Sequence, residues 1–185
     1  MKRLARSLTL VVVIVAAALA QTPPSPYSGQ EKREIKALST GEVEAYLNGR
    51  GMGFAKAAEL NSYPGPMHVL ELSGELELTE EQKAETQKIF EQMKSEAVRL
   101  GQSIVEKEAE LDRLFVRNEA NGGSLQTVVG EISGLQGALR MTHLRAHIEM
   151  KRLLSSEQVK KYDELRGYGS HEEGSQKLHH GHDGH

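Results

Sequence analysis

Histidine and methionine side chains at helical spacing are the residues most able to do chemistry in this chain. His143, His147 and Met150 fall at positions i, i+4 and i+7, which places them on one face of a helix. Imidazoles one turn apart can hold one metal ion, and a thioether beside them favours copper or nickel over magnesium. Leu144 follows His143, so the zinc-protease pattern H-E-x-x-H is absent. The spacing therefore predicts a metal site, with an ordinary helix face at the core boundary as the alternative.

A second pair of ligand-type residues lies on a shorter predicted helix. His68 and Glu71 are three residues apart, so their side chains share a helical face. They can complete a site with the histidines above only if the two helices face each other. The full predicted set for a divalent transition metal (zinc, nickel, cobalt or copper) is His68, Glu71, His143, His147 and Met150. No cofactor is expected to be required.

The last residues of the chain are rich in histidine. His171, His179, His180, His182 and His185 lie among glycines and acidic residues, a composition typical of a disordered segment. Neutral imidazoles in such a tail can bind zinc, nickel or copper loosely, and only where the pH leaves them unprotonated. We expect this tail to be a weak, additional metal-binding segment.

No catalytic constellation is recognisable in the sequence. Without cysteine, the chain cannot be a thiol enzyme or hold a metal through thiolates. No serine or lysine has a recognisable nucleophile motif around it, and the acidic pairs lie on helix faces expected to be solvated. We therefore expect a binding protein and not an enzyme.

The first residues have the pattern of an export signal. Lys2, Arg3 and Arg6 precede an apolar run over residues 8–20, which ends in the cleavage-type sequence Ala-Leu-Ala. An uncleaved anchor is the alternative, although the run is short for a membrane span. Cleavage after Ala20 would change the formal net charge from −3 to −6. An acidic mature chain argues against nucleic acid as a partner.

Two long helices are predicted to follow one another. Apolar residues spaced alternately by three and four predict a helix of about 36 residues from Glu80, and the pattern resumes after a predicted turn over residues 118–124. The two helices should pack antiparallel along one seam. The seam positions are Phe90, Met93, Ala97, Leu100, Ile104, Leu111 and Leu114, then Leu125, Val128, Ile132, Leu135, Leu139, Ala146 and Leu153.

Shorter helical pieces are expected before this hairpin, within residues 31–48, 54–60 and 67–76. Between the first two, glycines alternate in the pattern G-x-G-x-G over residues 49–53. No strand precedes them, so the pattern predicts a hinge and not a phosphate-binding loop.

Two segments share the pattern Leu-Ser/Thr-x-x-Gln at places where helices should begin. In each, the hydroxyl can cap the first turn, and the glutamine three residues later suits a capping box. The motif residues are Leu78, Thr79 and Gln82, and then Leu154, Ser155 and Gln158.

The paired motifs around a long helical hairpin, behind an export signal, resemble the Spy/CpxP (LTxxQ) family of periplasmic proteins, over roughly residues 66–166. Relatives of that family include ZraP-like proteins and CnrX-like heavy-metal sensors. The resemblance implies an elongated four-helix fold and a homodimer. It also implies ATP-independent chaperone activity on unfolded or misfolded envelope proteins, or metal and stress sensing, with a sensor protein as a possible partner.

The sequence thus predicts an all-α protein exported to the periplasm. Its expected parts are a signal peptide (1–20), a flexible linker (21–30), an N-terminal helical segment with a glycine-rich hinge (31–65), a Spy-like helical domain (66–167) and a disordered tail (168–185). The expected function is that of a periplasmic chaperone or envelope-stress protein; the alternative is a heavy-metal sensor or resistance protein.

Overall fold

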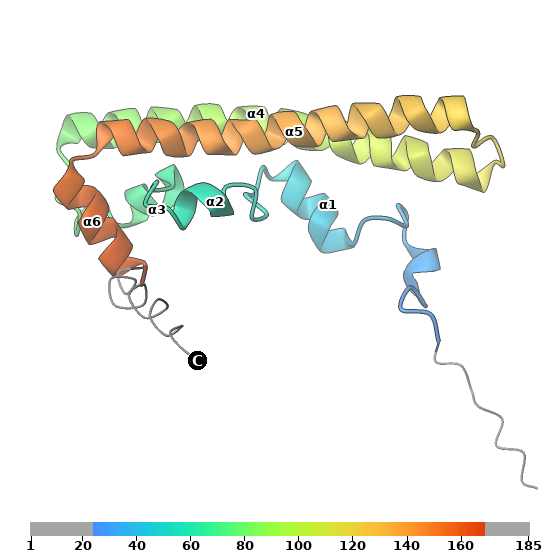
Figure 1. The fold of residues 1–185 in the computed structure, drawn as a ribbon, viewed down its shortest axis with the longest axis horizontal. Helices are drawn as coiled ribbons and strands as arrows, with labels where there is room; N and C mark the ends of the chain where they lie inside the picture. Colours follow the sequence, from blue (N-terminus) through green and yellow to red (C-terminus); the bar gives the residue numbers. More distant parts are fainter. Residues whose placement is uncertain (1–23, 169–185) are drawn as a thin grey trace, which may run out of the picture.

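Two long antiparallel helices dominate the molecule. The computed structural model describes residues 24–168, and that part of the chain is helical without strands. Helices α4 (Glu80–Val116) and α5 (Gly122–Leu153) pack side by side along their length (Figure 1). The predicted all-α fold with an elongated helical hairpin is confirmed. The predicted signal peptide and all five tail histidines lie outside the described residues.

Short elements cover one side of this hairpin. They are the 3₁₀ turn η1 (Gln30–Lys32) and the helices α1 (Thr40–Leu47), α2 (Lys56–Glu59), α3 (Pro66–Glu71) and α6 (Ser156–Leu165). Figure 1 shows α1, α2 and α3 in a row beneath the hairpin, with α6 turning away at the end where α4 begins. Within the described part of the chain, no helix has both the length and the hydrophobicity of a membrane span.

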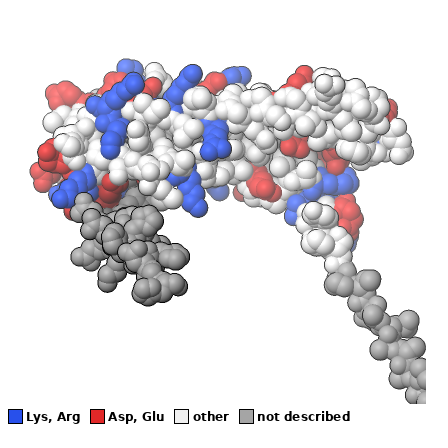
Figure 2. Space-filling model, in the orientation of Figure 1, with Lys and Arg blue, Asp and Glu red and all other residues white. Residues whose placement is uncertain are grey.

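The packed residues form two apolar cores along the hairpin. The core nearer α6 contains Val69, Leu76, Leu78, Ile89, Ala146, Met150, Leu154, Val159 and Tyr162. The core beneath α1 contains Ile35, Leu38, Tyr46, Ala97, Leu100, Ile104 and Leu139. Beyond both, the end that joins α4 to α5 exposes Phe115 and Val116, and Figure 2 shows few charged side chains there on the face in view.

The starts of α4 and α6 were predicted well because their caps are local. The Thr79 side chain accepts a hydrogen bond from the Gln82 amide, and the Gln82 side chain accepts one from the Thr79 amide. Ser155 and Gln158 repeat this reciprocal arrangement at α6. Each box satisfies N–H groups that a first turn leaves without partners.

The two motifs also bind each other, which their sequences did not indicate. The side-chain amide of Gln82 donates to Gln158 Oε1 at 2.8 Å, and that of Gln158 donates to Gln82 Oε1 at 3.0 Å. Leu78 and Leu154 are buried in the core nearer α6. The glutamine pair therefore joins the start of α4 to the start of α6, and the motif is structural in this protein.

This pairing predicts a measurable coupling between the two glutamines. Gln82→Ala and Gln158→Ala should each destabilise the protein, and a double-mutant cycle by chemical unfolding should give a coupling energy of about 1 kcal/mol. Gln87 lies on the exposed face of α4 and serves as the control. Gln87→Ala with Gln158→Ala should be additive; additivity of the Gln82 and Gln158 changes would contradict the pairing.

The first predicted helix is interrupted in the structure. Residues 31–48 do not form one helix: Ile35 and Leu38 are buried but lie in turns. Helix α1 begins only after Ser39, whose side chain accepts from the Glu42 amide in a capping box. A strong local cap in the middle of the apolar pattern thus starts a new helix there.

Two other boundaries also differ from the prediction. Gly122 and Gly123 were expected in the turn, but they form the first turn of α5, because the Asn121 side chain caps it by accepting from the Gly123 and Ser124 amides. Helix α3 ends at Glu71, five residues before the predicted limit at Leu76. Leu76 is nevertheless buried, because the chain turns there to enter α4.

Candidate functional site

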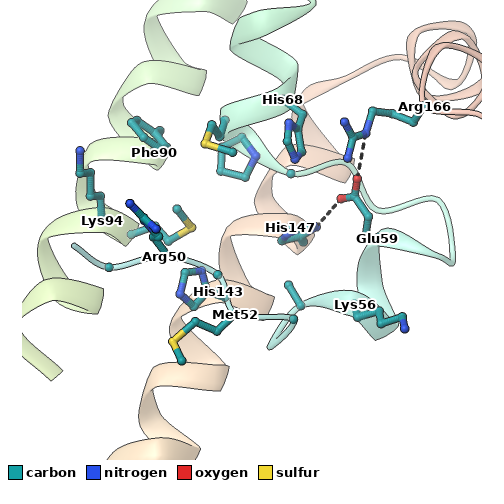
Figure 3. A pocket seen from close by; sticks show the side chains of 18 of the residues that line it. Arg50, Met52, Lys56, Glu59, His68, Phe90, Lys94, His143, His147 and Arg166 are labelled. Carbon is teal, nitrogen blue, oxygen red and sulfur yellow. Dashed lines mark ion pairs between the residues drawn. The ribbon is translucent and has the colours of Figure 1, made fainter. Parts of the chain in front are cut away.

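A pocket of about 750 Å³ lies between the hairpin and the row of short helices. Its walls come from the glycine-rich loop over residues 49–53, from α2 and α3, from α4 and α5, and from the residues that follow α6. His68, His143 and His147 all line it, and we call it the histidine pocket. Three of the five predicted metal ligands are thus brought to one cavity (Figure 3).

His143 is the most deeply placed of these histidines, with 3% of its surface exposed. Its ring stacks on that of Phe54, with centroids 6.3 Å apart and planes at 13°. Its Nε2 atom is buried and has no hydrogen-bond partner among the described residues. Burial lowers the pKa of His143 below its usual value, and nearby His147 adds to this effect. The ring is therefore held neutral, with a nitrogen lone pair available.

His147 is fixed by the loop that precedes α3. Its Nδ1 atom lies 2.7 Å from the main-chain carbonyl oxygen of Tyr63. A carbonyl only accepts, so Nδ1 carries a proton, and in the neutral ring Nε2 has the lone pair. Gly65 leaves room beside this ring, since a methyl group there would lie 3.0 Å from its Cε1 atom.

His68 has the same arrangement with a carboxylate. Its Nδ1 atom lies 2.8 Å from Glu71 Oε2, so Nδ1–H donates to Glu71 and Nε2 remains free. A ring N–H bound to a carboxylate or carbonyl is the usual support of a metal-ligating histidine. Glu71 itself does not line the pocket, so the structure places it as the residue that orients His68.

Met150 also lies outside the pocket. It is completely buried in the core nearer α6, which it shares with Val69 of α3 and Tyr162 of α6. The five predicted ligands are therefore not gathered in one place. Within residues 24–168, no three histidine, aspartate or glutamate side chains lie close enough together to hold one ion. Met52, Met67 and Met93 do line the pocket and bring thioether sulfur to it.

Glu59 is a site residue that the sequence did not reveal. Its carboxylate, with 14% of the side chain exposed, accepts hydrogen bonds from the hydroxyl groups of Tyr162 at 2.7 Å and Tyr168 at 3.2 Å. Arg166 Nε lies 3.4 Å away, close enough for an ion pair but not aligned as a hydrogen bond. Figure 3 shows Glu59 between Arg166 and His147, whose Nδ1 is 3.6 Å from the carboxylate.

This network ties the last described residues to α2. Burial raises the pKa of Tyr162 well above its usual value, and acceptance by Glu59 adds to the shift, so the hydroxyl stays protonated and donates. The two tyrosines lie 103 and 109 residues after Glu59 in the chain. No local sequence pattern predicts a contact between residues so far apart in the chain.

Comparison with protein families matches the heavy-metal resistance family over residues 43–161, which is more than half of the chain. The protein belongs to the heavy-metal resistance family. This family belongs to the Spy/CpxP-like helical periplasmic proteins, so the predicted resemblance is confirmed at that level. The matched range includes all three pocket histidines and Glu59. A search of curated proteins found no match, and neither did a search of solved structures.

Membership in the heavy-metal resistance family bears on the predicted function. It agrees better with the predicted alternative, a metal sensor or resistance protein, than with the predicted chaperone. Members of the family are typically exported periplasmic proteins, in agreement with the predicted location. The family is also compatible with metal binding, without indicating which metal.

Proposed function

We propose that this protein binds a transition-metal ion in the histidine pocket and serves in heavy-metal resistance or sensing in the periplasm. One observation supports this most directly. His68, His143 and His147 come from two helices far apart in the sequence, and they line one pocket with Nε2 unbound in each. In His68 and His147, the ring Nδ1 contacts a carboxylate or a main-chain carbonyl oxygen, which is the usual support of metal-ligating histidines in proteins.

The chemistry of the donor set favours copper among the four predicted metals. Imidazole nitrogen and thioether sulfur together suit a soft ion, whereas structural zinc is held by four closely placed ligands. His143 and His147 would be the central ligands. Figure 3 shows Met52 beside His143, so its thioether is a candidate for a soft ligand. His68 lines the same pocket from α3, but among the described residues no third histidine or carboxylate lies close enough to share one ion with His143 and His147. When bound, the ion would link the hairpin to the row of short helices.

Metal-dependent stabilisation tests this proposal. The melting temperature of the purified protein should rise with added copper, and less with nickel or zinc, because binding to the folded state alone stabilises it by mass action. The increase should persist after deletion of residues 171–185, which removes the tail histidines. It should disappear in a His143→Ala, His147→Ala double variant.

The tail deletion separates the pocket from the tail as the source of binding. If the deletion alone abolishes every metal response, while the double variant keeps it, metal binding belongs to the tail and the proposed pocket site is wrong. A chelator added to the untreated protein provides the metal-free reference.

Chaperone activity is the second candidate. It is supported by the exposed methionines Met52, Met67 and Met141, whose flexible side chains suit varied apolar clients. The proposed partners are unfolded envelope proteins, a sensor protein and a second copy of the chain. This activity would use exposed apolar surface, with Met52 and Met67 at the pocket and Met141 on α5, and it does not depend on the pocket histidines.

A further inference from the structure

The lining of the histidine pocket is basic, and we call the part formed by Arg50 and Lys94 the basic wall. Arg50, Lys56 and Lys94 line the pocket, and none of them forms an ion pair with any residue that the structure describes. The fourth basic lining residue, Arg166, is already paired with Glu59, which is the single acidic residue of the lining. With neutral histidines, the lining has a formal charge of +3, in a chain whose net charge is −3.

The backbone places two of these cations together. Gly49 has a φ of +61°, and a methyl group on it would lie 3.1 Å from the main-chain oxygen of Lys94. The loop therefore packs closely against α4 at Lys94, and Arg50 is the next residue of the loop after Gly49. Figure 3 shows Arg50 and Lys94 at the same end of the pocket, beside Phe90. The Lys94 ammonium lies 5.8 Å from the centre of the Phe90 ring, which keeps it over an apolar surface.

The rest of the lining is apolar and accessible. Met52, Leu60 and Met67 are 39%, 55% and 46% exposed, which is unusual for large apolar side chains gathered around one cavity. Phe90 and Met93 continue this surface along α4. A cavity of about 750 Å³ lies within the usual size range of small-molecule sites.

We propose that the histidine pocket binds a single-chain amphipathic anion, that is, an unbranched apolar chain with a carboxylate or similar anionic head. The head lies between Arg50 and Lys94, where charge-assisted hydrogen bonds to an anion are free to form. The chain lies along the methionine side chains, which adapt to irregular apolar ligands. The proposal uses the basic wall and not the histidines, so it stands independently of metal binding.

Titration calorimetry with decanoate tests the proposal on the metal-free full chain, in the presence of a chelator. We expect saturable binding at one site per chain that weakens as salt is added. Decanol and decyltrimethylammonium share the chain but lack the anionic head, so they should bind about tenfold more weakly or worse. Equal binding of the three probes would overturn the proposal, because the cations would then have no role.

Matched charge variants locate the head group. Arg50→Ala with Lys94→Ala should weaken decanoate binding by about tenfold or more. Lys88→Ala with Arg99→Ala removes the same charge from exposed positions that do not line the pocket, and it should leave binding unchanged. Equal losses in the two double variants would show a general charge effect and overturn the site.

Two further arms separate the proposal from its alternatives. The His143→Ala, His147→Ala variant should keep decanoate binding even where it loses the metal response, so the two proposals can fail separately. An acidic peptide without long apolar side chains should not displace decanoate. Full displacement by such a peptide would assign the basic wall to acidic segments of proteins instead.

Met52→Gln with Met67→Gln tests the position of the apolar chain. This double variant should weaken decanoate binding, and unchanged binding would contradict the placing of the chain along the methionines.

Discussion

Gly101→Ala is expected to destabilise the protein by about 3 kcal/mol, because the position has no room for a methyl group. Gly101 is buried on α4 where the end of α1 crosses it. A methyl group there would overlap the main-chain carbonyl group of Tyr46. A backbone group cannot rotate away as a side chain can, so α1 would have to move off α4. Chemical unfolding measures the loss.

Gly137→Ala is the matched control for this change. Gly137 lies inside α5, and a methyl group on it would meet no atom within 4 Å. Alanine favours helix over glycine by about 1 kcal/mol, so this variant should be stabilised by up to that amount. Opposite signs for the two variants are the expected result. Similar free energies of unfolding for the two variants would mean that α1 does not pack closely against Gly101.

The same contact supports the pocket. Helix α1 leads directly into Gly49 and Arg50, which form part of the pocket wall. If Gly101→Ala moves α1 from α4, Arg50 should leave Lys94. We therefore expect this variant to lose decanoate binding as well as stability, whereas Gly137→Ala keeps both.

Glu59→Ala is expected to cost about 3 kcal/mol, because it removes one member of a mostly buried charged network. Tyr162 and Tyr168 would lose the acceptor of their hydroxyl groups, and Arg166 would lose its counter-ion. Buried donors left without partners account for much of such a loss. Glu59→Gln keeps an acceptor of the same size and should cost less. The free energy of unfolding is the measurement.

A surface glutamate provides the comparison. Glu96 pairs with Arg99 three residues later on the exposed face of α4. Exposed pairs of this kind contribute between about 0 and 1 kcal/mol, so Glu96→Ala should have a small effect. The chain has no tryptophan, so its near-ultraviolet circular dichroism reports largely on tyrosine. Glu59→Ala should reduce that signal by freeing the two tyrosines, and Glu96→Ala should not. An equal, small loss for both variants would mean that Glu59 is not a structural centre.

The proposed metal site was only partly predictable, and the reason lies in helix packing. Spacing along α5 places His143, His147 and Met150 on one face of the helix. Different parts of the chain pack against that face at different points along the helix. The glycine-rich loop and the loop before α3 line the pocket with the two histidines, whereas Met150 shares a buried core with residues of α3 and α6. The sequence predicted that His68 and Glu71 lie together, but it predicted both of them as metal ligands. The structure places Glu71 behind His68, because a carboxylate bound to Nδ1 lies on the side of the ring away from Nε2.

The sequence by itself determined the two long helices of the hairpin and the capped starts of α4 and α6. These depend on contacts within about four residues, such as the boxes of Thr79 with Gln82 and Ser155 with Gln158, or on an apolar period repeated over many turns. Only the tertiary structure decided the pairing of the two glutamines, the role of Glu59 and the approach of Arg50 to Lys94. Each of these joins residues more than forty positions apart. Such contacts produce no periodic pattern in the sequence, because they depend on how the folded helices pack against one another. A single close contact, such as that of Gly101 with the Tyr46 backbone, sets where two helices cross.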